Sequence, residues 1–253
     1  MSKNECRIPK ESSDYQQMSS FVLDKIGSII GDAIQSGDNE IFIRTNLKRG
    51  LPLENISKVA GPFVEAWALE KFEAIADNTG NKYGLIHVEA GKRLDPSDII
   101  LQFKKKNPKA EYISANIDVK ATAEDIKSAG KSPNITSYER IRNEYLDDPD
   151  YIFVVLSLKH KVYSEKGDEV GITYGIMEVT AYSAYDLKYV GEKDLNYNPA
   201  LGTEQLQIRD IHYVEVTKRT TWEFLKMLDK KYIKSRGETS WKKMARKNEW
   251  IKD

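Results

Sequence analysis

Apolar residues recur every three or four positions in two stretches of the first third of the chain, the spacing of one face of a helix. In residues 15–33 the pattern consists of Tyr15, Met18, Val22, Ile26, Ile29 and Ala33. In residues 55–77 the apolar positions lie on more than one face, which predicts a largely buried helix. Gly61 and Pro62 mark either its start or a break inside it.

Short apolar runs bounded by turn residues predict strands at 83–89, 98–103, 113–120 and 151–156, with others near 175–181, 185–190 and 205–216. The run at 151–156 is continuously apolar, which indicates a strand covered on both faces. Helical patterns follow at 137–146, 222–235 and 241–248. The sequence therefore predicts an α/β (α+β) fold with a mixed central β-sheet flanked by helices. Because no Pro-, Gly- or Ser-rich linker divides the chain, we expect one domain over residues 1–253.

Composition excludes several classes of protein. Hydrophobic residues make up 40% and charged residues 31% of the 253 positions, which is typical of a globular protein. No apolar run is long enough to cross a membrane, and the polar start of the chain lacks the apolar segment of a secretion signal. Cys6 is the only cysteine, so neither an internal disulfide framework nor a Cys-based zinc site is expected. We expect a cytoplasmic protein.

The net charge of zero hides an uneven distribution. Residues 218–252 hold twelve Lys and Arg against four Asp and Glu, so a basic helical region is expected at about 219–253. Such a region could form a basic surface for nucleic acid, or it could be a solvated helical face rich in Lys.

The candidate chemistry lies between residues 95 and 122. Asp118 and Lys120 are two positions apart on a predicted strand, so both side chains point to one face, while Ile117 and Val119 point to the other. Asp98 begins the preceding strand, and a hairpin near residues 107–108 would bring the two strands together.

Two converging carboxylates repel each other unless a cation lies between them, and oxygen ligands of this kind suit Mg²⁺. Lys120 could then orient or deprotonate an attacking water, or offset phosphate charge. The alternative is an ordinary Asp118–Lys120 pair on a strand surface. A further carboxylate could come from the second helix, where Glu65 and Glu70 are the candidates.

This pattern resembles the PD-(D/E)XK nuclease superfamily, in which an acidic residue starts one strand and Asp/Glu-x-Lys lies on the next. Asp98, Asp118 and Lys120 match these positions, although Ser97 replaces the proline that usually precedes the first acid. The resemblance implies that Asp98, Asp118 and Glu65 bind the metal, because the superfamily often adds a helix glutamate and the segment from Gly61 to Glu65 looks like that element.

Loops beyond the core resemble those of blunt-cutting type II restriction endonucleases, notably residues 130–137 and 196–209, together with 45–55 and 247–253. That resemblance implies a Mg²⁺-dependent homodimer that cuts double-stranded DNA at the centre of a six-base palindrome, with GTTAAC as the expected site, and leaves 5′-phosphates.

The polar residues of these loops are the types that contact base edges and phosphates in DNA complexes. The candidate DNA-binding residues are Asn134, Thr136, Ser137, Asn198, Thr203, Gln205, Gln207, Arg209, Lys218 and Arg219. The alternating pattern at 205–209 is equally typical of a half-exposed strand with a solvated face.

Two other functions remain open from the sequence: a structure-specific repair or junction-resolving nuclease of the same superfamily, and a non-catalytic DNA-binding module. No phosphate-binding loop of the P-loop type is present, so a nucleotide cofactor is not expected. The three histidines have no metal-ligand spacing, which disfavours zinc chemistry.

Overall fold

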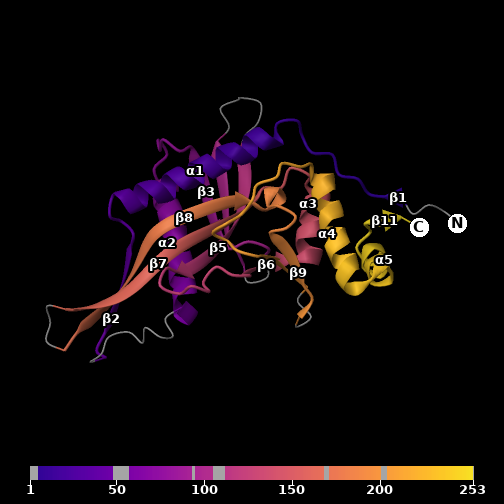
Figure 1. The fold of residues 1–253 in the computed structure, drawn as a ribbon. Helices are drawn as coiled ribbons and strands as arrows, with labels where there is room; N and C mark the ends of the chain where they lie inside the picture. Colours follow the sequence, from indigo (N-terminus) through magenta and orange to yellow (C-terminus); the bar gives the residue numbers. More distant parts are fainter. Residues whose placement is uncertain are drawn as a thin grey trace.

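The computed structural model describes residues 5–47, 57–92, 95–104, 112–167, 171–200 and 204–252. A six-stranded mixed sheet runs through its middle, in the order β2-β8-β7-β5-β4-β3, as the sequence predicted in kind (Figure 1). Its strands are β2 (Glu40–Thr45), β3 (Leu85–Ala90), β4 (Ile99–Lys104), β5 (Tyr112–Ala123), β7 (Phe153–Lys166) and β8 (Thr173–Asp186). All neighbouring strands are antiparallel except β5 and β7, which are parallel.

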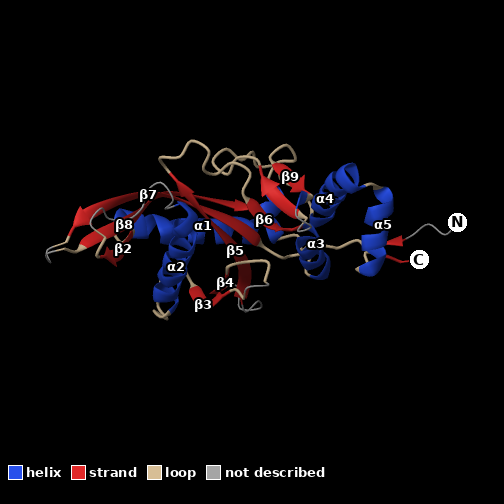
Figure 2. Cartoon of the chain, turned by 90° about the horizontal axis from the view of Figure 1, so that it is seen from below, coloured by secondary structure: helices blue, strands red, loops and turns tan. Residues whose placement is uncertain are grey.

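Two long helices cover one face of this sheet (Figure 2). They are α1 (Tyr15–Gln35) and α2 (Ser57–Ala76), and Pro62 lies within the first turns of α2 rather than breaking it. Apolar residues of both helices form the first core together with alternate residues of β4, β5 and β7. The alternation predicted for residues 113–120 is confirmed, because Ile113, Ala115, Ile117 and Val119 are buried in this core.

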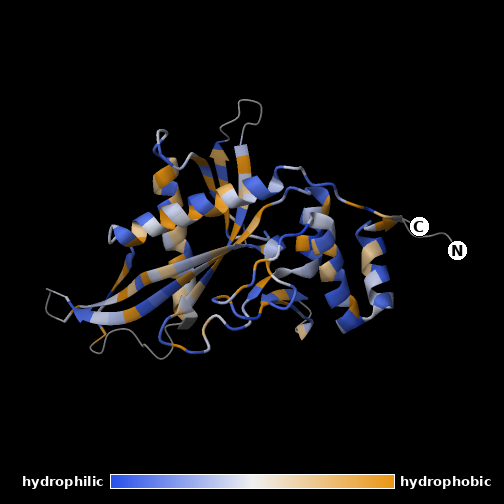
Figure 3. Cartoon of the chain, turned by 45° about the horizontal axis from the view of Figure 1, so that its top comes forward, coloured by the Kyte–Doolittle hydropathy of each residue, from blue (hydrophilic) through white to orange (hydrophobic). Residues whose placement is uncertain are grey.

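A second core lies at the other end of the molecule, where both described termini are found (Figure 1). It joins a three-stranded sheet, β6 (Asn134–Ser137), β10 (Gln205–Ile208) and β9 (Leu195–Asn198), to helices α3 (Tyr138–Asp147), α4 (Thr221–Arg236) and α5 (Glu238–Lys247). The short strands β1 (Glu5–Cys6) and β11 (Ile251–Lys252) pair beside α5. The helices at this end mix hydrophobic and hydrophilic positions along their length (Figure 3), as expected of helices with one buried face.

Three strand predictions were wrong in detail. Residues 175–181 and the start of 185–190 belong not to two strands but to the single strand β8, which ends at Asp186 and is followed by a short 3-10 helix at Leu187–Tyr189. Only Gln205–Ile208 of the predicted strand 205–216 is a strand. Strands β1, β2, β6, β9 and β11 were not predicted. No described helix is long and apolar enough to cross a membrane.

A buried ion pair holds α3 against α4. Arg142 is 1% exposed, and its Nε and Nη2 lie 2.7 and 3.0 Å from the two carboxylate oxygens of Asp229. Tyr138 donates its hydroxyl to the same carboxylate at 2.6 Å, and the guanidinium lies over the Trp250 ring, 4.0 Å from its centroid. These contacts join α3, α4 and the segment just before β11 through one ion pair.

We predict that Asp229→Ala lowers the free energy of unfolding by about 3–5 kcal/mol, because it leaves a buried guanidinium without its counter-charge. Urea denaturation followed by circular dichroism measures the change. The control is Lys242→Ala, which removes an exposed helical ion pair with Glu238 and should cost at most about 0.5 kcal/mol. Equal losses in the two variants would contradict the importance of the buried pair.

Candidate active site

Asp118 and Lys120 project from the same face of β5. Their neighbours Ile117 and Val119 are buried in the first core, so strand alternation places the carboxylate and the ammonium on the opposite face. Lys120 Nζ lies 2.6 Å from Asp118 Oδ1. The sequence predicted that the two side chains share a face, because this depends only on the two-residue period of a strand.

Asp98 lies immediately before β4 and meets β5 at the point where the two strands begin to pair. Its backbone N–H donates to the Ile117 carbonyl at 2.8 Å. Its carboxylate Oδ2 accepts a hydrogen bond from the Val119 N–H at 2.7 Å. The Asp98 carboxylate therefore accepts the β5 hydrogen bond that a backbone carbonyl of a longer β4 would have accepted. This places the carboxylate at the edge of β5, beside Asp118.

A close backbone approach positions the segment that carries Asp98. The Gly91 N–H donates to the Asp98 carbonyl at 2.6 Å. A Cβ atom on Gly91 would lie 2.0 Å from the Ser97 carbonyl oxygen, so only glycine permits this approach without displacing the backbone. Ser97, which replaces the usual proline, is buried.

The Asp118 carboxylate is buried and only half satisfied. Its residue is 3% exposed, and among the described residues Oδ2 has no hydrogen-bond partner. Burial raises the pKa of Asp118 to about 7; the Lys120 ammonium opposes the rise, while the Asp98 and Glu65 carboxylates add to it. An orphaned buried oxygen of this kind is a group that a hard cation would satisfy.

The helix glutamates differ in position. Glu65 is half-buried, and burial and then the nearby Asp98 carboxylate raise its pKa, while Lys120 lowers it. Glu70 is exposed and lines a separate hollow of about 270 Å³ with Glu40 and Phe63. Glu65 is thus the helix carboxylate that lies within electrostatic range of Asp98 and Lys120.

In the described residues no three Asp, Glu, His or Cys side chains are arranged closely enough to hold a metal ion by themselves. Mg²⁺ typically takes one or two protein carboxylates and completes its shell with waters and substrate oxygens. Asp98 and Asp118 are carboxylates of that kind, and Glu65 interacts electrostatically with Asp98.

The structure gathers most of the predicted DNA-reading residues on the three-stranded sheet. Gln207 Nε2 donates to Asn134 Oδ1 at 2.9 Å, and Gln205 pairs with Ser137 on one side and Asn198 on the other. Leu206 and Ile208 are buried in the second core, so the Gln205 and Gln207 side chains point away from it.

The remaining predicted contacts are placed differently. Thr136 is buried, so its side chain is not part of the face that carries Gln205 and Gln207. Arg209 Nη2 lies 2.8 Å from the buried carboxylate of Asp194. Thr203 lies outside the described residues.

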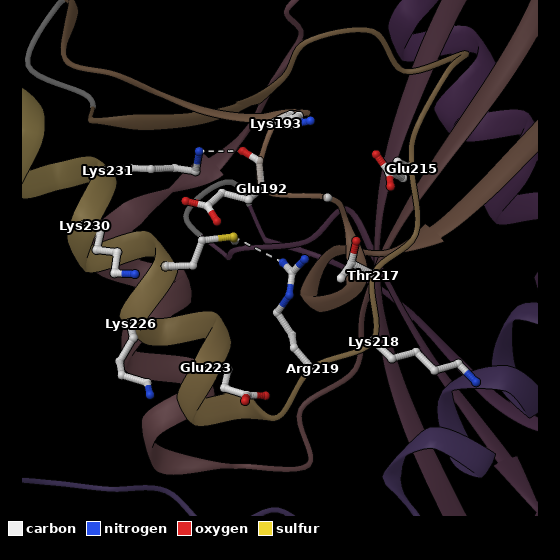
Figure 4. A pocket seen from close by; sticks show the side chains of 12 residues that line it. Glu192, Lys193, Glu215, Thr217, Lys218, Arg219, Glu223, Lys226, Lys230 and Lys231 are labelled. Atoms are coloured by element: carbon white, nitrogen blue, oxygen red, sulfur yellow. Dashed lines mark hydrogen bonds between the residues drawn. The ribbon is translucent and has the colours of Figure 1, made fainter.

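Lys218 and Arg219 line a hollow of about 840 Å³ beside α4 (Figure 4). Lys226, Lys230 and Lys231 of α4 face it, whereas Lys218 points away from the helix. Arg219 is engaged within the protein, because its Nη1 donates to the Val190 carbonyl at 2.8 Å. Helices α4 and α5 lie within the predicted basic region, and Arg219, just before α4, makes a hydrogen bond inside the protein.

Comparison with known proteins identifies relatives of nearly the whole chain. The family model for the type II restriction endonuclease HpaI matches residues 2–249. The type II restriction enzyme HpaI of Haemophilus parainfluenzae is 51% identical over 249 residues, which cover 98% of this chain and 97% of that enzyme. Among solved structures, the NlaIV restriction endonuclease superposes with a TM-score of 0.39 at 14% identity, covering 97% of this chain and 91% of that one, a likeness too slight to argue from.

We predict that Asp118→Asn stabilises the metal-free protein at pH 8. The folded-state pKa of Asp118 is raised to about 7, against about 3.9 for an unfolded chain, so the stability that this group contributes is fully present below pH 4 and is lost as the pH rises to 7. The always-neutral amide avoids that loss. The gain should therefore be absent near pH 4 and reach at most about 4 kcal/mol above pH 7.

Urea denaturation in EDTA across this pH range measures the gain. The control is Asp24→Asn, which removes an exposed ion pair with Lys25 on α1 and should change the free energy of unfolding by at most about 1 kcal/mol. An Asp118→Asn protein no more stable than the unaltered protein at pH 8 would contradict the burial of an ionised carboxylate.

Proposed function

This chain belongs to the HpaI family of type II restriction endonucleases, and from that premise we propose that it cuts both strands of a DNA palindrome by metal-assisted hydrolysis at Asp98, Asp118 and Lys120. As a member of this family it is a site-specific deoxyribonuclease, and DNA is its substrate. Family membership disfavours the two alternatives that the sequence left open, a junction-resolving nuclease and a non-catalytic DNA-binding module.

The observation that carries the catalytic assignment is the unsatisfied, buried Asp118 Oδ2 beside the Asp98 carboxylate and the Lys120 ammonium. We propose that Asp98 and Asp118 would hold a divalent cation, Mg²⁺, and that Glu65 would complete the set once the ion offsets the repulsion between the carboxylates. When bound, that cation stabilises the charge developing on the phosphate and acidifies a bound water.

Lys120 has two tasks in this proposal. Before metal binds, its ammonium offsets the charge of Asp118. During hydrolysis it holds the attacking water in line with the scissile bond and offsets the charge of the phosphate oxygens. Water adds to phosphorus while the bond to the 3′ oxygen breaks, so the products are a 5′-phosphate and a 3′-hydroxyl.

We propose GTTAAC, cut at its centre, as the recognised palindrome, on the resemblance of residues 45–55 and 247–253 to HpaI and of the loops at 130–137 and 196–209 to blunt-cutting enzymes. Asn134, Ser137, Asn198, Gln205, Gln207 and Arg209 are the proposed contacts on and beside the three-stranded sheet. A two-fold symmetric site calls for a two-fold symmetric protein, so we propose a homodimer with one catalytic centre for each strand.

We predict discrete cleavage of a plasmid that carries one GTTAAC site, in the presence of Mg²⁺, with blunt ends at the centre of the site. Sequencing the ends of the product identifies the site and the position of the cut. Discrete fragments cut at another sequence would show that GTTAAC is the wrong site but would not count against the catalytic residues.

We predict that Lys120→Ala lowers kcat about 10³-fold, because it removes a charge that stabilises the transition state. Binding of DNA, measured by gel shift in EDTA, should change little.

The matched control is Lys82→Ala, because Lys82 pairs with Asp32 on an exposed surface and should leave the rate unchanged. Full activity of the Lys120→Ala enzyme would show that Lys120 is not a catalytic residue.

The two helix glutamates provide a separate prediction. Glu65→Gln should raise the Mg²⁺ concentration needed for half-maximal rate and lower kcat at least about tenfold, since it removes a carboxylate close to Asp98. Glu70→Gln, an identical change about one turn further along the same helix, should stay within twofold of the unaltered enzyme. A Mg²⁺ titration of the cleavage rate distinguishes them, and equal behaviour of the two variants would leave Glu65 without a role in metal binding.

A further inference from the structure

A second lysine stands on the catalytic face, one strand away from Lys120. In the parallel pairing of β5 with β7, Lys120 lies opposite Ser157 and Thr122 lies opposite Lys159. Leu156 and Leu158 are buried in the first core with Val119, so Ser157 and Lys159 point to the same side as Lys120. Two residues along the strand and one strand across correspond to about 8 Å between the Cα atoms of Lys120 and Lys159.

The ammonium of Lys159 has no carboxylate partner among the residues that the structure describes, although the side chain is only half exposed. Other lysines of these strands are neutralised. Lys120 pairs with Asp118, and Lys161 pairs with Glu178 at 2.9 Å. An unpaired ammonium that is partly withdrawn from water is costly unless an anion joins it.

Lys159 lies in the wall of a hollow of about 190 Å³ just beyond the end of β5. Lys127 and Lys131 also line it, as do two carboxylates, Glu124 and Asp210. Both carboxylates already have partners: Glu124 accepts a hydrogen bond from the Thr180 hydroxyl at 3.1 Å, and Asp210 pairs with Lys131. The described lining therefore carries three ammonium groups against two carboxylates, an excess of positive charge that an anion can offset.

His212 also lines the hollow and lies close enough to Lys159 for the two groups to interact electrostatically. Burial lowers the pKa of His212, and the Lys159 ammonium lowers it further. The ring lies directly against Gly130, where a Cβ atom would come within 2.6 Å of His212 Nε2. This close approach holds an imidazole that can donate a hydrogen bond at the wall of the hollow.

We propose that Lys159 binds a DNA phosphate next to the scissile one, on the strand that is cut at Asp98, Asp118 and Lys120. The assignment rests on the proposed function, because it needs DNA to lie across β5. Its role is to place the substrate strand, since Lys120 faces the Asp98 and Asp118 carboxylates, whereas Lys159, with its Cα about 8 Å from that of Lys120, lies in the wall of the hollow beyond the end of β5. Lys159 is thus a positioning and binding residue, separate from the residues that carry out the hydrolysis.

The test uses the full-length enzyme and an oligonucleotide duplex with its own cleavage site. Lys159→Gln keeps most of the side-chain length and removes the charge. We expect it to raise KM about five- to tenfold and leave kcat within about twofold. The slope of log Kd against log salt should fall by about one, the value for one lost phosphate contact. Lys159→Arg should keep all three values, and Lys161→Ala, whose charge Glu178 already neutralises, is the matched control on the same strand.

The contacted phosphate is found by replacing single phosphates near the cleavage site with uncharged methylphosphonates. For the unaltered enzyme one neighbouring position should raise KM, and in Lys159→Gln that same substitution should cause no further loss, because the two changes remove one shared contact. Additive losses at every position would overturn the proposal, as would a normal KM and salt slope in Lys159→Gln. Failure of the unaltered enzyme to cut DNA would instead count against the proposed function.

Discussion

The hydrogen bond from the Val119 N–H to the Asp98 carboxylate is the interaction on which the catalytic edge depends. It forms just before β4 begins. Beyond Ile117, β5 has no strand partner on the β4 side. A carboxylate there satisfies a backbone donor that would otherwise lack a partner, and it comes to lie beside Asp118. The same bond that completes the ladder therefore creates the repulsion between two acids that a cation relieves.

That arrangement gives Lys120 a structural role in addition to its proposed role in hydrolysis. Without metal its ammonium is the counter-charge that lets Asp118 remain in a buried position at all. The pairing is incomplete, because Asp118 Oδ2 stays unsatisfied. Residues arranged for catalysis are often unfavourable for folding, and this carboxylate illustrates why: its burial weakens the metal-free fold at the pH where its charge is required.

How much could be predicted from the sequence follows from how local each feature is. The shared face of Asp118 and Lys120 depends on the period of a single strand. The meeting with Asp98 depends on the antiparallel pairing of β4 and β5, which are neighbours in the sequence; the turn expected near residues 107–108 lies outside the described residues. The choice between Glu65 and Glu70 could not be made from the helix pattern, because apolar residues lie on several faces of α2. It required the packing of α2 against β3 and β5.

The parallel register of β5 and β7 could not be predicted from local sequence patterns. Nearly thirty residues separate the two strands, and the long-range burial of residues such as Val154 and Leu156 sets their alignment. Lys159 was overlooked for this reason: nothing near it in the sequence links it to Lys120. Strand β8 was divided in two for a related reason, since its middle, around Tyr182 and Ser183, is partly exposed and resembles a connection between strands.

Strand β7 also explains how a DNA-reading surface can be held in register with a cutting edge. Its residues alternate between the two cores: Val154 and Leu156 are buried in the first, and Phe153 and Val155 in the second. The first core supports Asp118 and Lys120 through β5, and the second supports the proposed reading residues Gln205 and Gln207 through β10. Because interiors are close-packed, a shift of β7 would disturb both. In the proposed function, the separation between the bases read and the bond cut is therefore set by the packing of one strand rather than by a flexible connection.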